Sequence, residues 1–63
     1  MSNVVDQLYS EPEEVREFIF QALEKQKHDP RLSAMSMMRE RLGDRYTESQ
    51  LSTLWYAASW VMR

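Results

Sequence analysis

The sequence predicts an all-α domain with three main helices, over about residues 11–27, 30–42 and 47–63, and a short helical segment over about residues 2–9. Apolar residues recur at intervals of three and four, and no stretch alternates apolar and polar residues as a strand would. One Gly and two Pro are too few for a series of hairpin turns. The 63 residues form a single domain, 1–63, with a small core, because chains of this size bury only about 60% of their extended surface.

The first two helical stretches differ in length and in how strongly they are signalled. Residues 2–9 suit one or two helical turns that must dock on the rest of the fold or fray. Ser10 and Glu13 then fit a capping box, with Pro12 in the first turn, so the first main helix is expected to begin near Glu11. Its predicted core stripe comprises Val15, Phe18, Ile19, Ala22 and Leu23, and Phe20 lies off this stripe.

The next helix is predicted from a break at Asp29-Pro30, with Asp29 as N-cap and Pro30 at the first helical position. Gly43 is expected to end this helix in a left-handed conformation. Met37 faces away from the core on a helical projection. The predicted core stripe is looser than its neighbours and comprises Leu32, Met35, Met38 and Leu42, with Ala34 at the margin.

The last helix has the clearest start, because Thr47 and Gln50 fit a capping box and Tyr46 can pack on Leu51 as a hydrophobic staple. Its apolar residues point in two opposite directions. Tyr56 and Trp60 lie on one side, and the opposite, core-facing side carries Leu51, Leu54, Trp55, Ala58, Val61 and Met62.

The residue inventory argues against an enzyme. The chain has no Cys, one His and one Gly, so it lacks a thiol nucleophile and a phosphate-cradling loop, and His28 alone cannot build a structural zinc site. Met35 and Met38 are read as core packing residues and Met37 as part of a contact surface, rather than the three as a soft-metal site. We therefore expect no catalytic residue, metal, cofactor or small-molecule substrate. No signal peptide or membrane span is recognisable, and a cytoplasmic location is expected.

Two interpretations of Tyr56 and Trp60 follow from their position opposite the core. Val4, Val5 and Leu8 of the N-terminal segment could cover them, which would make a second small core. Otherwise Tyr56 and Trp60 form a binding face with Phe20 and Met37, for a second copy of the chain or for another protein, since aromatic residues dominate interface energetics.

The alternative function is nucleic-acid binding through a helix-turn-helix-like layout. A basic patch around residues 31–45 would make the contacts, through Arg31, Arg39, Arg41 and Arg45. Against it, the formal net charge is −2, and the last helix carries no basic residue before Arg63. A protein partner is therefore the first prediction and nucleic acid the second, with no membrane contact.

Overall fold

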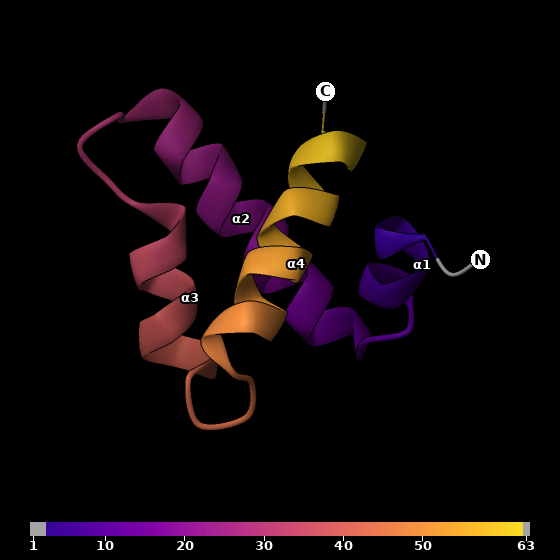
Figure 1. The fold of residues 1–63 in the computed structure, drawn as a ribbon. Coiled ribbons are helices and arrows are strands. Elements are labelled where there is room, and N and C mark those ends of the chain that lie inside the picture. Colours follow the sequence, from indigo (N-terminus) through magenta and orange to yellow (C-terminus); the bar gives the residue numbers. More distant parts are fainter. Residues whose placement is uncertain (1–2, 63) are drawn as a thin grey trace.

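The computed structural model describes residues 3–62, which form four helices and no strand. The helices are α1 (Val4–Tyr9), α2 (Glu13–His28), α3 (Ala34–Leu42) and α4 (Glu48–Val61). α4 lies between α1 on one side and α3 on the other, and α2 crosses behind it (Figure 1). α4 packs against all three other helices, and its most extensive contact is with α1. The predicted all-α bundle with a short N-terminal helix is confirmed.

The turn between α1 and α2 differs from the capping box expected at Ser10. The Ser10 hydroxyl donates to the carbonyl of Gln7 at 2.7 Å, so Ser10 closes α1 instead of opening α2. Pro12 is the N-cap of α2 and has no side-chain cap bond. The predicted start near Glu11 is therefore wrong by two residues. Arg16 holds the turn, because its guanidinium donates to the carbonyls of Tyr9 and Glu11 at 3.2 and 2.5 Å.

The predicted start of α3 at Asp29-Pro30 is also wrong. An Asp29 carboxylate oxygen accepts the backbone N–H of Arg31 at 3.1 Å, and the Arg31 guanidinium bonds the same carboxylate, which lowers the Asp29 pKa. These bonds form a local turn in place of the first helical turn. Leu32, expected in the core, is 42% exposed within this turn. The helix instead begins at Ala34, where the Ser33 hydroxyl accepts from the N–H of Ser36.

Gly43 ends α3 without the left-handed conformation that the sequence suggested. Its φ and ψ are −61° and −20°, and no described residue has a positive φ. The requirement for glycine is one of space, because a Cβ at this position would collide with the carbonyl oxygen of Arg39. That same oxygen accepts the Gly43 N–H at 2.9 Å, so the backbone cannot move away without losing a hydrogen bond.

The predicted start of α4 is confirmed. The Thr47 hydroxyl accepts from the Gln50 N–H at 3.2 Å, and the Gln50 side chain accepts from the Thr47 N–H at 2.8 Å. An ion pair of 2.5 Å between Arg39 and Glu48 joins α3 to this first turn. Both side chains of this pair are exposed, so its contribution to stability is small.

The core of α4 is shifted slightly from the predicted arc. Leu51, Leu54 and Ala58 are buried as expected, whereas Val61, predicted in the core, is 40% exposed. Ala57 is fully buried, because α1 packs along its side of α4 and extends the buried arc in that direction. Trp55 and Met62 are half-buried. The complete set of buried residues is Leu8, Val15, Ile19, Ala22, Leu23, Ala34, Met38, Leu42, Leu51, Leu54, Ala57 and Ala58.

A hydrogen bond between two turns gives a pH-dependent contribution to stability. The Tyr46 hydroxyl donates to Glu11 at 2.5 Å, and this bond to the carboxylate raises the pKa of Tyr46. A phenol whose pKa is higher in the folded state stabilises the fold below the unfolded pKa of about 10, and this contribution is lost as the pH rises through the folded pKa. We expect Tyr46→Phe to lower the free energy of unfolding by about 1 kcal/mol at pH 7. Urea unfolding at pH 7 and above pH 10 measures this, and a difference between the two proteins that persists at high pH would contradict it.

Candidate functional site

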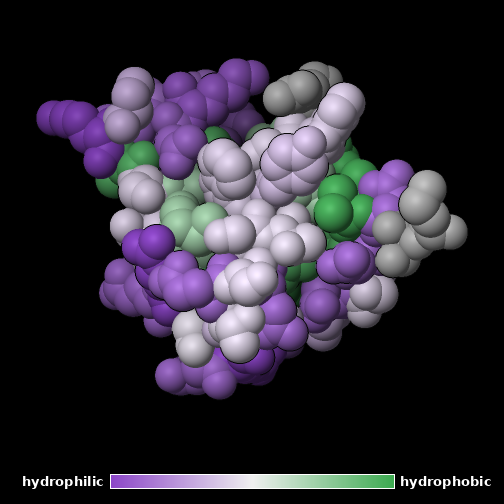
Figure 2. Space-filling view, in the orientation of Figure 1, coloured by the Kyte–Doolittle hydropathy of each residue, from purple (hydrophilic) through white to green (hydrophobic). Residues whose placement is uncertain are grey.

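The solvent-facing side of α4 carries no charge after its first residue. Residues 49–62 contain no Asp, Glu, Lys or Arg, although such residues make up 29% of the chain. We call the row Ser49, Thr53, Tyr56 and Trp60 the α4 seam, because these residues lie within about 60° of one another at 100° per residue. Figure 2 shows this side as pale atoms over α4, with hydrophobic atoms at the border with α1 and hydrophilic atoms around the edge.

Tyr56 and Trp60 occupy one end of the seam, next to α1. Each is 51% exposed. Together with Asn3, Val4 and Val5 they line a hollow of about 390 Å³, which we call the upper hollow. α1 therefore does fold against this side of α4, as one interpretation expected, but it leaves half of each aromatic side chain uncovered. Tyr56 and Trp60 are therefore neither buried in a second core nor fully exposed.

The other end of the seam carries small hydroxyl residues beside a second hollow. Ser49 and Thr53 line this lower hollow, which has a volume of about 330 Å³. Its wall is formed by α1, the α1–α2 turn, the α3–α4 turn and α4, and the remaining lining residues are Gln7, Ser10, Glu11, Tyr46, Gln50 and Leu54. The seam thus runs from a small-residue end with a polar hollow to an aromatic end with an apolar one.

Two hydroxyl groups of α4, Thr53 in the seam and Ser59 beside it, already have acceptors within the helix. The Thr53 hydroxyl donates to the Ser49 carbonyl at 3.0 Å, and the Ser59 hydroxyl donates to the Trp55 carbonyl at 2.9 Å. A polar group that keeps its hydrogen bond costs much less to remove from water than one that loses it. The uncharged side of α4 can therefore be covered at little electrostatic cost.

The other two residues predicted for the binding face lie elsewhere. Met37 lines a separate hollow on the α2–α3 side of the molecule, with Phe18, Glu40 and Arg41. Phe20 is half-buried and packs against the core. α3 and α1 lie on opposite sides of α4 (Figure 1), so Met37 does not share the hollow of Tyr56 and Trp60. The four predicted residues do not form one continuous hollow.

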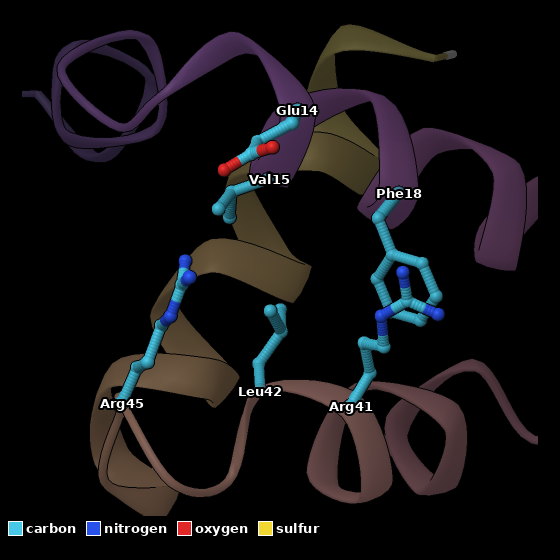
Figure 3. Close-up of a pocket in the computed structure, with 6 residues that line it drawn as sticks. All are labelled: Glu14, Val15, Phe18, Arg41, Leu42 and Arg45. Atoms are coloured by element: carbon cyan, nitrogen blue, oxygen red, sulfur yellow. The ribbon is translucent and has the colours of Figure 1, made fainter.

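The four arginines of the alternative function are divided among different local contacts. Arg31 bonds Asp29, and Arg39 pairs with Glu48. The Arg41 guanidinium lies 5.4 Å from the centre of the Phe18 ring and stacks over it (Figure 3). Arg41 and Arg45 line a hollow of about 180 Å³ that also contains the carboxylate of Glu14. Arg31 and Arg39 are thus paired with carboxylates, Arg41 stacks on an aromatic ring, and Arg45 lines the same hollow as Glu14.

The described residues also bear on metal and membrane chemistry. Within residues 3–62, no group of three or more His, Cys, Asp or Glu side chains is placed to hold a metal ion. His28 pairs with Glu24 at 3.1 Å on the exposed end of α2. None of the helices in this part of the chain is long and apolar enough to cross a bilayer.

Sequence reasoning found Tyr56 and Trp60 but did not assign Ser49 and Thr53 to the same site. A usable signal was present, because the intervals between Ser49, Thr53, Tyr56 and Trp60 are four, three and four residues, the spacing of helix-pairing seams. The absence of charge over residues 49–62 was a second signal. A comparison of the chain with known protein families, curated proteins and solved structures finds no match among them.

Proposed function

We propose that this chain is a non-enzymatic binding domain that associates with a protein through the α4 seam and the adjoining side of α1. The observation that carries the proposal is the half-exposed pair Tyr56 and Trp60 beside Val4 and Val5, on a helix side without charge. Interface centres are depleted in charged residues and enriched in Tyr and Trp. Large aromatic side chains contribute most where a partner completes their burial.

The apolar area that Tyr56 and Trp60 leave in water supports the same proposal. A chain of 63 residues has little apolar area to spare for its own core. Tyr56 and Trp60 leave about half of their surface in water, so their burial in the isolated domain is incomplete. A partner that covers them would bury apolar area worth about 25 cal/mol per Å² before the costs of association.

The experiment places a photo-crosslinking amino acid at Ser52, next to the seam, or at Lys25, on exposed α2. In cells that make this protein, we expect discrete protein adducts from position 52 and none from position 25. Trp60→Ala should abolish the adducts, whereas Leu32→Ala, which truncates an exposed apolar residue on the α2–α3 turn, should leave them. Equal labelling from positions 52 and 25, or adducts that survive Trp60→Ala, would contradict the proposal.

Salt dependence separates this function from the nucleic-acid alternative. Binding through an uncharged seam should change little between about 50 and 200 mM salt, whereas 6–10 phosphate contacts would cost roughly a thousandfold or more. The melting temperature of Trp60→Ala provides the folding control. Because Trp60 is half exposed, its truncation should cost only about 1 kcal/mol of stability.

A further inference from the structure

We infer that the occupant of the α4 seam is a second copy of this chain, paired antiparallel through α4 about a two-fold axis. This inference rests on the proposed function and names its partner. Four features of the seam carry it: the spacing of its residues, their order of size, the positions of the two hollows and the absence of charge.

The spacing of the seam matches a pair of packed helices. Ser49, Thr53, Tyr56 and Trp60 follow the four-three-four pattern of residues that form the contact line between two helices. The row spans eleven residue steps, or about 16 Å along the axis, which is three turns. It therefore offers four successive contact layers.

The order of residue sizes selects an antiparallel pair. In a two-fold arrangement, if residue i meets residue j, then j also meets i. Pairing the seam with its reversed copy brings each Trp60 onto the other chain's Ser49, and each Tyr56 onto its Thr53. Every layer then joins one large aromatic and one small residue. A parallel pair would instead place Trp60 against Trp60 and Ser49 against Ser49, which crowds one end and leaves a void at the other.

The lower hollow fits the same antiparallel pairing. Ser49 and Thr53 border the lower hollow of about 330 Å³, which is where the antiparallel pairing delivers the Trp60 indole of the second copy. An aromatic residue on one copy thus meets a recess on the other, twice per dimer.

Charge favours a second copy because a surface that meets its own copy must not repel itself. Residues 49–62 carry no charge, so a two-fold pairing of seams brings no like charges together, even though the whole chain is acidic. A standard interface covers about 800 Å² per partner, roughly a sixth of the 4630 Å² surface of this chain.

The first test measures mass in solution. Sedimentation equilibrium from about 1 µM to 1 mM protein should show the mass rising from 7.6 kDa towards twice that value. Trp60→Ala should weaken this dimerisation at least about tenfold, and Leu32→Ala should not change it.

A Trp55→Phe background makes Trp60 the sole tryptophan and hence the fluorescence reporter. That replacement is mild, because the buried Nε1–H of Trp55 has no hydrogen-bond partner among the described residues.

The second test measures the direction of pairing with single cysteines, which is possible because the chain has none of its own. In the antiparallel pair, the two copies of residue 53 lie about 4.5 Å apart along the axis, and the two copies of residue 49 lie about 16 Å apart. A disulfide requires Cα atoms within about 7 Å. Under mild oxidation, Thr53→Cys should therefore cross-link readily and Ser49→Cys should not. Equal cross-linking at both positions would overturn the antiparallel register.

The outcomes also separate this inference from the proposed function. A monomer at 1 mM, with position 52 adducts to a different protein, overturns the dimer and leaves the binding function standing. A dimer that Trp60→Ala leaves intact also overturns the inference, because self-association would then use another surface. The proposed function falls only if the position 52 adducts also survive Trp60→Ala.

Discussion

Replacing Leu54 with Ala should lower the free energy of unfolding by about 2 to 5 kcal/mol. Leu54 is 3% exposed, in the helix that contacts all three others, so its truncation leaves a cavity that no single neighbour can fill. A domain of this size has a total stability of roughly 3 to 9 kcal/mol at typical values per residue. The variant should therefore be largely unfolded near 37 °C, which thermal and urea unfolding followed by circular dichroism will show.

Val61 provides the matched control for Leu54. It lies two turns further along the same helix but is 40% exposed. Val61→Ala should change stability by about 0.5 kcal/mol or less. Similar melting temperatures for the two variants would mean that Leu54 is not buried, since the two residues lie on the same face of α4 and differ in burial because Val61 is at the end of the helix.

Replacing Leu8 with Ala should release α1 from α4. Leu8 is fully buried and is the only fully buried residue of α1, so it is the main anchor of this six-residue helix, while Val4 packs against the core only partly. The truncation should cost about 2 to 5 kcal/mol. Because α1 does not contact α3 and touches α2 only slightly, we expect local release rather than global unfolding.

Hydrogen exchange gives the measurement for Leu8→Ala. Amides of residues 4–9 should lose protection while those of α2, α3 and α4 keep it. In the Trp55→Phe background, Trp60 emission should also shift to longer wavelength, because Val4 and Val5 would no longer border the upper hollow. Val5→Ala, at a half-buried position, should show a much smaller effect. Loss of protection in all four helices together would contradict the local character of the release.

The sequence predicted the existence and order of the helices better than their boundaries. Thr47 was assigned correctly because its capping box and the neighbouring apolar pattern agree on one start. Asp29 and Ser33 are both good N-cap residues, and local rules favoured Asp29 because Pro30 follows it. The choice of Ser33 also involves a longer-range bond, in which the Gln26 side chain accepts the N–H of Ala34 at 2.7 Å. Such a bond appears only once α2 and α3 have packed.

The sequence predicted on which side of α4 the candidate site lies, but not how much of it α1 covers. Rotation by 100° per residue places Tyr56 and Trp60 opposite Leu51 and Leu54, as observed. How far they are covered depends on where α1 docks, and a six-residue helix carries too little pattern to decide that. Met37 was grouped with Tyr56 and Trp60 because each of these residues faces away from the apolar core stripe of its own helix. The exposed sides of two helices can lie on different sides of a bundle. The packing of α3 and α1 on opposite sides of α4 shows that Met37 and the Tyr56–Trp60 pair are separated in this way.

The contacts of α4 also determine when this fold can assemble during synthesis. A ribosome releases the chain from its N-terminus, so α1, α2 and α3 emerge first. α1 makes no contact with α3, and α4 is the helix that packs against all three. Until residues 48–61 have emerged, Leu8 and the other buried apolar side chains lack the helix that covers them. The nascent chain therefore stays open to proteases and chaperones until α4 has emerged.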